Sequence, residues 1–403
     1  MIFGTHDEKT LTQYRDVASK AKRTALMADG HMGYVMPIGG VAAYSNKVSV
    51  TGVGYDIACG NAAILTDLRA EGLADFSNRS ARVDLGTIAD EIANTISFGV
   101  GRKNTQSDAP VNHSLFEDPA WDALPEKADK EKLRDKARSQ LGTVGSGNHY
   151  VDVFVDEIDR LWVGVHFGSR GFGHTIASGF LALAKGEEWG TRVPESEALL
   201  DLDTDLGRSY WAMMNLAGQY AYAGREWVAR KVVEILNGKE LGMVHNHHNF
   251  AWMEMHEGEA LVVVRKGATP AFPGQMGFVG GSMGDDSVIL EGVESATSAS
   301  AMYSTVHGAG RVMSRTQARG KVKGWGRKAK VVSPGLISDE MMREWMEKKG
   351  VVIRGGGLDE APQAYRRLPD VLAAQGETIR VLNTLRPLIV VMAGAHEFDP
   401  YKD

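Results

Sequence analysis

Two residues three positions apart, Asp56 and Cys59, form the first candidate for chemistry in this chain. They lie in the segment GYDIACG, where flanking glycines allow a carboxylate and a thiolate to converge on one point. Cys59 is the single cysteine, so it forms no internal disulfide and is a buried small hydrophobe, a nucleophile or a metal ligand. Oxygen and sulfur ligands together suit a transition metal rather than magnesium or calcium. Alone, the motif is more typical of a loop aspartate beside a buried cysteine.

Several histidines stand at the ends of expected elements, next to glycine or asparagine. His149 follows Asn148 after a glycine-rich turn, and His166 ends an apolar run before GSRG. His248 and Asn249 open a polar stretch. A single histidine of this kind is more often a satisfied core residue than a ligand, but several in one setting favour a shared site. The spacing is not that of a local zinc finger, so it does not establish that they meet.

His307, in STVHGAGRVMSR, has a different setting. Small residues on its C-terminal side leave the imidazole accessible and allow backbone N–H groups to face an anion. Arg311 and Arg315 follow four and eight residues later, on the same face if the segment is helical. An imidazole beside anion-binding groups can act as a nucleophile toward phosphorus. The alternative is a glycine turn with a capping histidine.

Composition indicates the class of protein but does not identify a binding partner. The chain has 403 residues, of which 43% are hydrophobic, and no run approaches the roughly 18 apolar residues of a membrane helix. The N-terminal segment MIFGTHDEKT lacks the apolar core of a secretory signal, so we expect a cytoplasmic protein without membrane spans. The net charge is −6, yet Arg311 to Lys330 holds eight Lys or Arg residues and no acid. Such a run is either a solvated face or a phosphate-binding surface.

The pattern of apolar residues predicts one α+β domain spanning residues 1–403, with no internal repeat and no linker. The 47 glycines cluster between apolar runs, which suggests a site assembled from many loops. Helices are expected at 11–26, 84–97, 122–140 and 207–236. Strands are expected within 35–44, 47–55, 149–155, 161–167, 259–267 and 286–292. The segment 366–394 reads as a helix followed by a strand, and 101–121 as a long loop.

The order of these motifs resembles the RtcB family of RNA ligases along nearly the whole chain, from DGHMGYVMPIGGVAA (29–43) to DEAPQAY (359–365). Between them lie GYDIACG, GSGNHYVDV, VHFGSRGFGH, HNFAWMEMH, RKGATPAFPG, GGSMGDDS and STVHGAGRVMSR. The resemblance implies the family's α+β fold around a deep, metal-containing cleft. It also implies joining of RNA 3′-phosphate or 2′,3′-cyclic phosphate ends to 5′-hydroxyl ends, in RNA repair or tRNA splicing. In this reaction a histidine would first be guanylylated by GTP.

The resemblance also assigns roles to residues. Ligands for two Mn²⁺ ions, with the thiolate bridging, would be Asp56, Cys59, His149, His166 and His248. His307 would be the guanylylated histidine. In HNHHN an alternative register would use His245, but His248 fits the residues that follow. Guanylate-contacting positions would be Asn148, His149, Asp152, His248, Asn249, Gly280, Gly281, Ser282, Met283, Ser287, His307, Gly308, Ala309, Gly310 and Met392. Arg311 and Arg315 would hold RNA phosphate.

The chain departs from the family pattern at three positions. Asp152 stands where a glutamate reads the guanine edge, and Met392 stands where a lysine contacts the base. Because methionine donates no hydrogen bond, base preference is open, and Lys402 is a candidate to compensate. Phe167 replaces a small residue near the expected metals.

Three hypotheses therefore stand. They are a GTP-dependent RNA ligase, a related enzyme with altered nucleotide or end specificity such as 3′-end nucleotidylation, and a metal-dependent RNA-binding protein without catalysis. The last would not need the full set of ligands together with His307. We expect a monomer, and the sequence leaves open whether an activating protein partner is needed.

Overall fold

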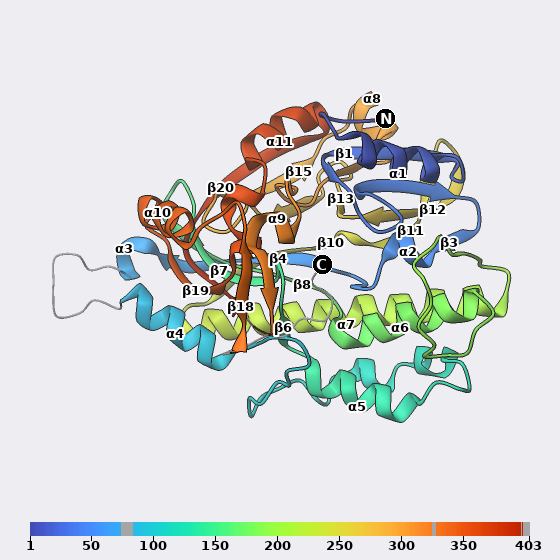
Figure 1. Ribbon diagram of the computed structural model, residues 1–403, viewed down its shortest axis with the longest axis horizontal. Helices are drawn as coiled ribbons and strands as arrows, with labels where there is room; N and C mark the ends of the chain where they lie inside the picture. Colours follow the sequence, from blue (N-terminus) through green and yellow to red (C-terminus); the bar gives the residue numbers. More distant parts are fainter. Residues whose placement is uncertain (74–83, 325–327, 396, 398–403) are drawn as a thin grey trace.

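The computed structural model describes residues 1–73, 84–324, 328–395 and 397, and Lys402 lies outside them. Helices and strands are mixed along the chain, so the α+β class is confirmed (Figure 1). The longer helices are α1 (Glu8–Ala18), α4 (Leu85–Thr95), α5 (Lys130–Gln140), α6 (Arg170–Ala184), α7 (Asp205–Ile235), α10 (Asp339–Lys349) and α11 (Leu368–Gln375). Shorter ones are α2 (Val50–Val53), α3 (Ala70–Leu73), α8 (Ala296–Ser300), α9 (Arg315–Arg319), η1 (Ser114–Glu117), η2 (Pro119–Ala123), η4 (Leu358–Glu360), η5 (Pro362–Ala364) and η6 (Gly376–Thr378).

An eight-stranded sheet forms the centre of the molecule, in the order β10-β4-β8-β7-β20-β15-β14, with β19 beside β20. Its strands are β4 (Gly60–Arg69), β7 (Tyr150–Val155), β8 (Arg160–Phe167), β10 (Glu240–His247), β14 (Met276–Val279), β15 (Ser287–Gly292), β19 (Val352–Gly356) and β20 (Ile379–Gly394). A four-stranded antiparallel sheet consists of β1 (Arg23–His31), β2 (Ile38–Tyr44), β12 (Glu259–Lys266) and β11 (Asn249–His256). Four small pairs are β3 (Lys47–Ser49) with β9 (Leu199–Asp201), β5 (Ser97–Phe98) with β6 (Thr143–Gly145), β13 (Ala268–Pro270) with β16 (Ser304–Val306), and β17 (Gly320–Lys323) with β18 (Lys330–Pro334).

Strand β20 joins two parts of the central sheet and sets the register of one wall of the site. Its first half pairs with β15, and its second half pairs with β7 and β19. The second half, from Pro387 to Ala393, is almost entirely buried. In this register Val390 lies opposite Asp152, and Met392 lies opposite Tyr150. Two segments far apart in sequence therefore present their side chains to the same cavity.

Helix α7 packs against strands β4 and β8 of the central sheet, and α6 lies beside α7 (Figure 1). Helix α7 begins where the Thr204 hydroxyl accepts a hydrogen bond from the Gly207 N–H, which satisfies one of the free donors of its first turn. Its apolar side buries Tyr210, Met214 and Tyr220 against the core. The helix predicted at 207–236 is therefore confirmed, and it supplies the support beneath the site.

Several sequence expectations hold, and three need correction. The strands expected at 149–155 and 161–167 are β7 and β8, and 366–394 contains α11 followed by β20. The helix expected over 11–26 ends at Ala18, because Arg23 to Leu26 pair with β2 instead. The strand expected over 47–55 stops at Ser49, whose side chain caps the helical turn α2. The helix expected over 122–140 begins only at Lys130, after η2.

The loop expected at 101–121 contains two 3₁₀ turns, η1 and the start of η2, that bury Phe116 and Trp121. In the part of the chain that the structure describes, no helix has both the length and the apolar character that crossing a membrane requires.

Candidate active site and metal centre

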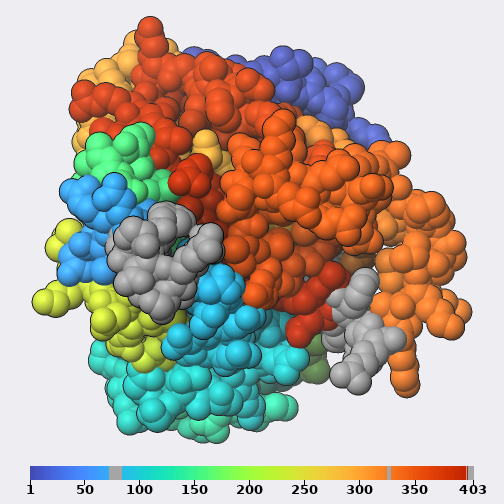
Figure 2. Space-filling model, turned by 90° about the vertical axis from the view of Figure 1, so that its left-hand side faces the viewer, coloured from blue at the N-terminus to red at the C-terminus, as the bar shows by residue number. Residues whose placement is uncertain are grey.

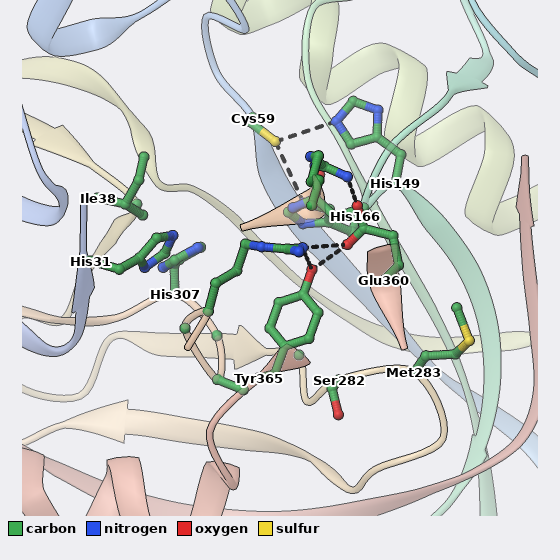
Figure 3. A pocket seen from close by; sticks show the side chains of 18 of the residues that line it. His31, Ile38, Cys59, His149, His166, Ser282, Met283, His307, Glu360 and Tyr365 are labelled. Carbon is green, nitrogen blue, oxygen red and sulfur yellow. Dashed lines mark hydrogen bonds and ion pairs between the residues drawn. The ribbon is translucent and has the colours of Figure 1, made fainter. Parts of the chain in front are cut away.

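A cavity of about 850 Å³ lies between the two large sheets and gathers most of the residues singled out from the sequence (Figure 3). All of the expected metal ligands line it, and so does His307. The other candidates on its wall are Asn148, Asp152, Asn249, Gly280, Gly281, Ser282, Met283, Gly308, Ala309, Gly310 and Met392. Ser287 is the exception. It is buried one layer behind, where its hydroxyl accepts a hydrogen bond of 3.0 Å from the Gly281 N–H.

Asp56, Cys59 and His149 form the first of two clusters of potential ligands. Asp56 and Cys59 lie in the loop between α2 and β4, and His149 directly precedes β7. The His149 Nε2 atom lies 3.0 Å from Asp56 Oδ2 and 3.7 Å from Cys59 Sγ. Because the Asp56 carboxylate also occupies the place where a Cβ on Gly168 would stand, 2.3 Å from Oδ1, only glycine fits there.

Cys59, His166 and His248 form the second cluster, which shares the thiol with the first. His166 lies in β8, and His248 lies between β10 and β11. The distance from Cys59 Sγ to His166 Nε2 is 3.6 Å, and in each cluster one ligand atom per residue lies within 4.8 Å of the others. Ligands about 2.0–2.3 Å from one ion lie about 3–4 Å from each other, so both clusters have the dimensions of a metal site.

Hydrogen bonds behind the clusters orient the imidazoles. The His149 Nδ1–H donates to the Val144 carbonyl at 2.9 Å, which turns Nε2 toward Asp56 and Cys59. The His166 Nδ1–H donates to Asn61 Oδ1 at 2.6 Å, which likewise turns Nε2 toward the thiol. His248 Nδ1 is buried and has no hydrogen-bond partner among the described residues. Lone pairs that face one another in this way are satisfied by a cation between them.

The protonation states of these groups also suit a metal. Burial, reinforced by neighbouring positive charge, lowers the pKa of His166 and of His248 well below the ordinary value, so both rings are neutral. Burial alone would raise the pKa of Asp56, but the His149 hydrogen bond and the charge of Arg170 lower it to about 2. Burial and the Asp56 charge raise the pKa of the Cys59 thiol, so its thiolate requires a compensating cation. One carboxylate, one thiol and three imidazoles fit a first-row transition metal better than magnesium or calcium.

His307 lies next to these clusters and is held by a partner that the sequence did not single out. Its Nδ1–H donates to Asp29 Oδ2 at 2.6 Å, and its backbone N–H donates to the same oxygen at 2.9 Å. Asp29 belongs to β1 and its side chain is fully buried, whereas 15% of the His307 side chain is exposed to the cavity. No described residue hydrogen-bonds to His307 Nε2. The ring therefore presents one free nitrogen. The centre of the His307 ring lies 4.9 Å from the centre of the His248 ring.

Asp152 and Met392 form the opposite end of the cavity. Met392 packs with Met283 and Val390 in a small apolar cluster, beside Tyr150. Asp152 is buried, Oδ1 has no hydrogen-bond partner among the described residues, and burial raises the pKa of its carboxyl well above the ordinary value. This wall therefore combines an apolar face with one unpaired carboxyl, which suits a planar ring that carries polar edge groups.

Arg311 and Arg315 line the cavity, but both guanidiniums already have acidic partners. Arg311 donates to Glu360 at 3.2 Å, to the Tyr365 hydroxyl at 2.8 Å and to the Asp359 carbonyl at 2.7 Å. Arg315 forms ion pairs with Asp359, at 3.3 Å, and with Glu360. The expectation that these arginines hold RNA phosphate therefore requires that phosphate compete with two carboxylates.

A buried arginine in α7, Arg225, connects the segments that carry three of the candidate ligands. Its Nη1 donates to the Ala58 carbonyl at 2.9 Å and to the Phe167 carbonyl at 2.6 Å. Its Nη2 lies 2.8 Å from His247 Nδ1. These partners directly adjoin Cys59, His166 and His248 in sequence. Arg225 is 0% exposed and has no carboxylate ion pair within the described ranges.

The structure also shows where His245 and Phe167 lie. His245 accepts a hydrogen bond from Arg225 Nε at 2.8 Å, on the far side of β10 from the clusters, so the register that uses His248 agrees with the geometry. Phe167 follows His166 on β8 and points to the opposite face, where its ring approaches Gly224 of α7. It does not line the cavity.

Sequence reasoning missed Asp29, Asn61 and Arg225. Asp29 opens the DGHMG segment that carries part of the resemblance, which was a usable signal. Asn61 follows Cys59 by two residues, and nothing in the sequence distinguishes it from an ordinary strand residue. Arg225 sits in a long helix where arginines are usually solvent-exposed, so only the tertiary structure identifies it.

An α+β fold with one deep cleft, two thiol-sharing ligand clusters and a carboxylate-held histidine defines a narrow structural class, and comparisons with known proteins identify it. A model of the family described as tRNA-splicing ligase RtcB matches residues 11–393. The RNA-splicing ligase RtcB of Escherichia coli K12 is 31% identical over 397 residues, which cover 92% of this chain and 90% of that protein. The tRNA-splicing ligase RtcB of Archaeoglobus fulgidus is 30% identical over 90% of this chain and 86% of its own length. That of Thermococcus kodakarensis is 29% identical over 94% and 90%. The chain belongs to the RtcB family.

Proposed function

We propose that the protein is an RNA ligase that joins a 3′-phosphate or 2′,3′-cyclic phosphate end to a 5′-hydroxyl end through a guanylylated His307. The observation that carries this proposal is the placement of His307. Its Nδ1 is held by Asp29 at 2.6 Å, and its ring adjoins the ligand His248. A binding protein without catalysis would not need a histidine nucleophile prepared in this way beside a complete set of ligands.

The chain's own groups suggest how the covalent step proceeds. Asp29 keeps the proton on Nδ1, so Nε2 attacks the α-phosphorus of GTP with its lone pair, and pyrophosphate leaves. The positive charge that develops on the ring is stabilised by the Asp29 carboxylate. Where the RNA ends in a 2′,3′-cyclic phosphate, water first adds to the phosphorus and the bond to O2′ breaks, which leaves a 3′-phosphate. An oxygen of the RNA 3′-phosphate then takes the guanylate from Nε2. The 5′-hydroxyl finally attacks the activated 3′-phosphorus, and GMP leaves.

Two manganese ions would be held by the two clusters, with Cys59 shared between them. When bound, they would supply Lewis-acid stabilisation of negative charge on phosphate oxygens. The Asp56, Cys59, His149, His166 and His248 side chains provide a preorganised, largely desolvated set of donors for this purpose.

A second candidate function, a related enzyme with altered base preference, is favoured by the chemistry around Asp152. An ionised carboxylate accepts the two N–H groups of the guanine edge, whereas a neutral carboxyl can donate one hydrogen bond and accept another, as adenine requires. Burial raises the pKa of the Asp152 carboxyl and so favours its neutral form, and Met392 supplies no positive charge to favour the ionised form. Within the part of the chain that the structure describes, no cation beside Asp152 favours guanine.

The decisive experiment offers the manganese-loaded protein GTP or ATP labelled at the α-phosphate. Acid-labile label from GTP, lost in His307→Ala, is expected if the first proposal holds. Label from ATP, or equally from both, would instead support the second. Protein shown to contain metal that takes label from neither nucleotide would contradict both.

Restoring a lysine at position 392 should increase the preference for guanine. Asp152 and Met392 are diagonal neighbours across β7 and β20, so a lysine ammonium can approach the carboxyl and favour its ionised form. A hydrogen bond to a charged group contributes about 1.5–3 kcal/mol, so we expect Met392→Lys to raise the GTP-to-ATP labelling ratio about tenfold or more. Met392→Leu, which adds no charge, is the matched control. Equal ratios in the two variants would show that position 392 does not read the base.

A further inference from the structure

Strands β17 and β18 form a two-stranded ribbon that pairs with no other strand in the described part of the chain. Every residue of β18 is exposed. The orange part of the chain, which includes both strands, stands out at the right-hand edge of the molecule in Figure 2. The ribbon therefore contributes little to the core, which leaves its side chains free for a partner.

One face of the ribbon carries a concentration of positive charge. Lys321 and Lys323 are two residues apart on β17, so their side chains lie on the same face of the strand. Lys323 lies directly opposite Lys330 of β18. Like charges in directly opposite positions destabilise a strand pair unless an anion neutralises them. All three lysines are exposed, and none forms an ion pair within the ranges that the structure describes. They are available to an external anion.

The lysines differ in this respect from the arginines that precede them. Arg311, Arg315 and Arg319 all contact Asp359 or Glu360, so these two carboxylates compensate most of their charge. From residue 311 to residue 338 the sequence contains no acid, although the whole chain carries a net charge of −6. Most of the uncompensated positive charge of this region therefore lies on the ribbon.

The ribbon directly follows one wall of the cavity in the chain. Ser314, Arg315 and Gln317 line the cavity, and α9 runs from this wall directly into β17. The five residues of α9 and the four of β17 have a combined length of about 20 Å, which sets how far the ribbon can reach from this wall. An RNA strand whose end is held at His307 must pass over one of the cavity walls to reach solvent.

We propose that the lysine face of the β17–β18 ribbon binds the phosphate backbone of single-stranded RNA outside the cavity. Lysines without acidic partners suit sequence-independent phosphate contacts. A protein partner is the alternative, because Val331 and Val332 are 61% and 65% exposed. A specific protein interface, however, covers about 800 Å² on each partner, far more than two valines present.

The test compares wild type with the triple variant Lys321→Gln, Lys323→Gln and Lys330→Gln. The affinity for an RNA that ends in a 3′-phosphate is measured over a range of salt concentrations, with a 20-mer and with a trimer. Each phosphate contact contributes about 0.7 to the salt slope for single strands, so the 20-mer slope should fall by about 2. The loss should be confined to the 20-mer, because the trimer does not extend beyond the cavity.

A second triple variant, Lys47→Gln, Lys132→Gln and Lys239→Gln, removes the same charge from exposed positions on other elements and should keep the wild-type slope. An unchanged 20-mer slope in the ribbon variant, or equal losses for 20-mer and trimer, would overturn the proposal. The exposed valines would then point to a protein partner. The inference rests on RNA being the substrate but not on the ligation chemistry. Since binding is measured without joining, an inactive wild-type protein would contradict the proposed function and leave this readout intact.

Discussion

Replacing Asp29 with asparagine should slow the labelling of His307 by about 10²- to 10³-fold, and His307→Ala should abolish labelling and RNA joining. Asp29 Oδ2 accepts hydrogen bonds from the His307 backbone, the His307 ring and, at 3.3 Å, the Gly308 N–H. An asparagine would keep its amide oxygen at this position, because these donors require an acceptor. The tautomer of His307 is then preserved, and only the negative charge is lost.

This distinction makes the expected result specific. If Asp29 only oriented the ring, Asp29→Asn would leave the rate near that of wild type. If the carboxylate stabilises the charge on the imidazole, the single-turnover rate of labelling falls while nucleotide affinity changes little. The measurement is therefore the labelling rate at saturating nucleotide, together with the nucleotide dissociation constant.

Asp156→Asn provides the matched control for this experiment. Asp156 is also buried, and it accepts hydrogen bonds from the backbone of Ile158, at 3.1 Å, and of Arg160, at 2.9 Å. It does not line the cavity. Its substitution should lower thermal stability without slowing the labelling rate. A wild-type labelling rate in Asp29→Asn would show that the carboxylate serves the fold alone.

The comparison between sequence and structure shows which features local patterns can reveal. Strands β7 and β8 are short, nearly continuous apolar runs, and α7 carries a continuous apolar side, so these elements were predictable. Strand β1 was not, because Arg23 to Leu26 continue a helical pattern and become a strand only by pairing with β2. Tertiary pairing overrides local propensity in such segments.

The site divides in the same way. Motifs in the sequence identified the five candidate ligands and His307, and the structure brings them to one cavity. The contact between Asp29 and His307 joins residues 278 positions apart, so no local pattern could predict it. Arg311 and Arg315 were recognised as basic residues, but their pairing with Asp359 and Glu360 depends on the fold. The sequence gives the type of each residue, but it does not give the contacting residue that determines the charge and reactivity of that side chain in the fold.

Replacing Arg225 with methionine should weaken manganese binding by about 10- to 100-fold, even though Arg225 itself is no ligand. Arg225 donates hydrogen bonds to the carbonyls of Ala58 and Phe167 and contacts His247. Each of these residues precedes or follows a candidate ligand. Burial lowers the pKa of Arg225 to about 10, so the guanidinium stays charged at neutral pH and keeps all of its donors.

A loss of stability is also expected, so metal affinity must be separated from folding. Without Arg225 two buried carbonyls lose a donor, at about 1–3 kcal/mol each, and the free energy of unfolding should fall by several kcal/mol. Arg265→Met is the matched control. Arg265 is likewise 0% exposed, but it pairs with Glu254 at 2.6 Å and donates to Ser304 at 2.8 Å, away from the clusters.

Both variants should therefore unfold at lower temperature, but only Arg225→Met should bind Mn²⁺ more weakly in a direct titration of the folded protein. The spectrum of bound Co²⁺ gives a second readout, because it reports the arrangement of sulfur and nitrogen ligands around the ion. We expect an altered spectrum in Arg225→Met, an intermediate effect in Arg225→Lys, which can restore one carbonyl contact but not the whole set, and a wild-type spectrum in Arg265→Met. Equal metal affinities in Arg225→Met and Arg265→Met would show that Arg225 supports the fold and does not position the ligands.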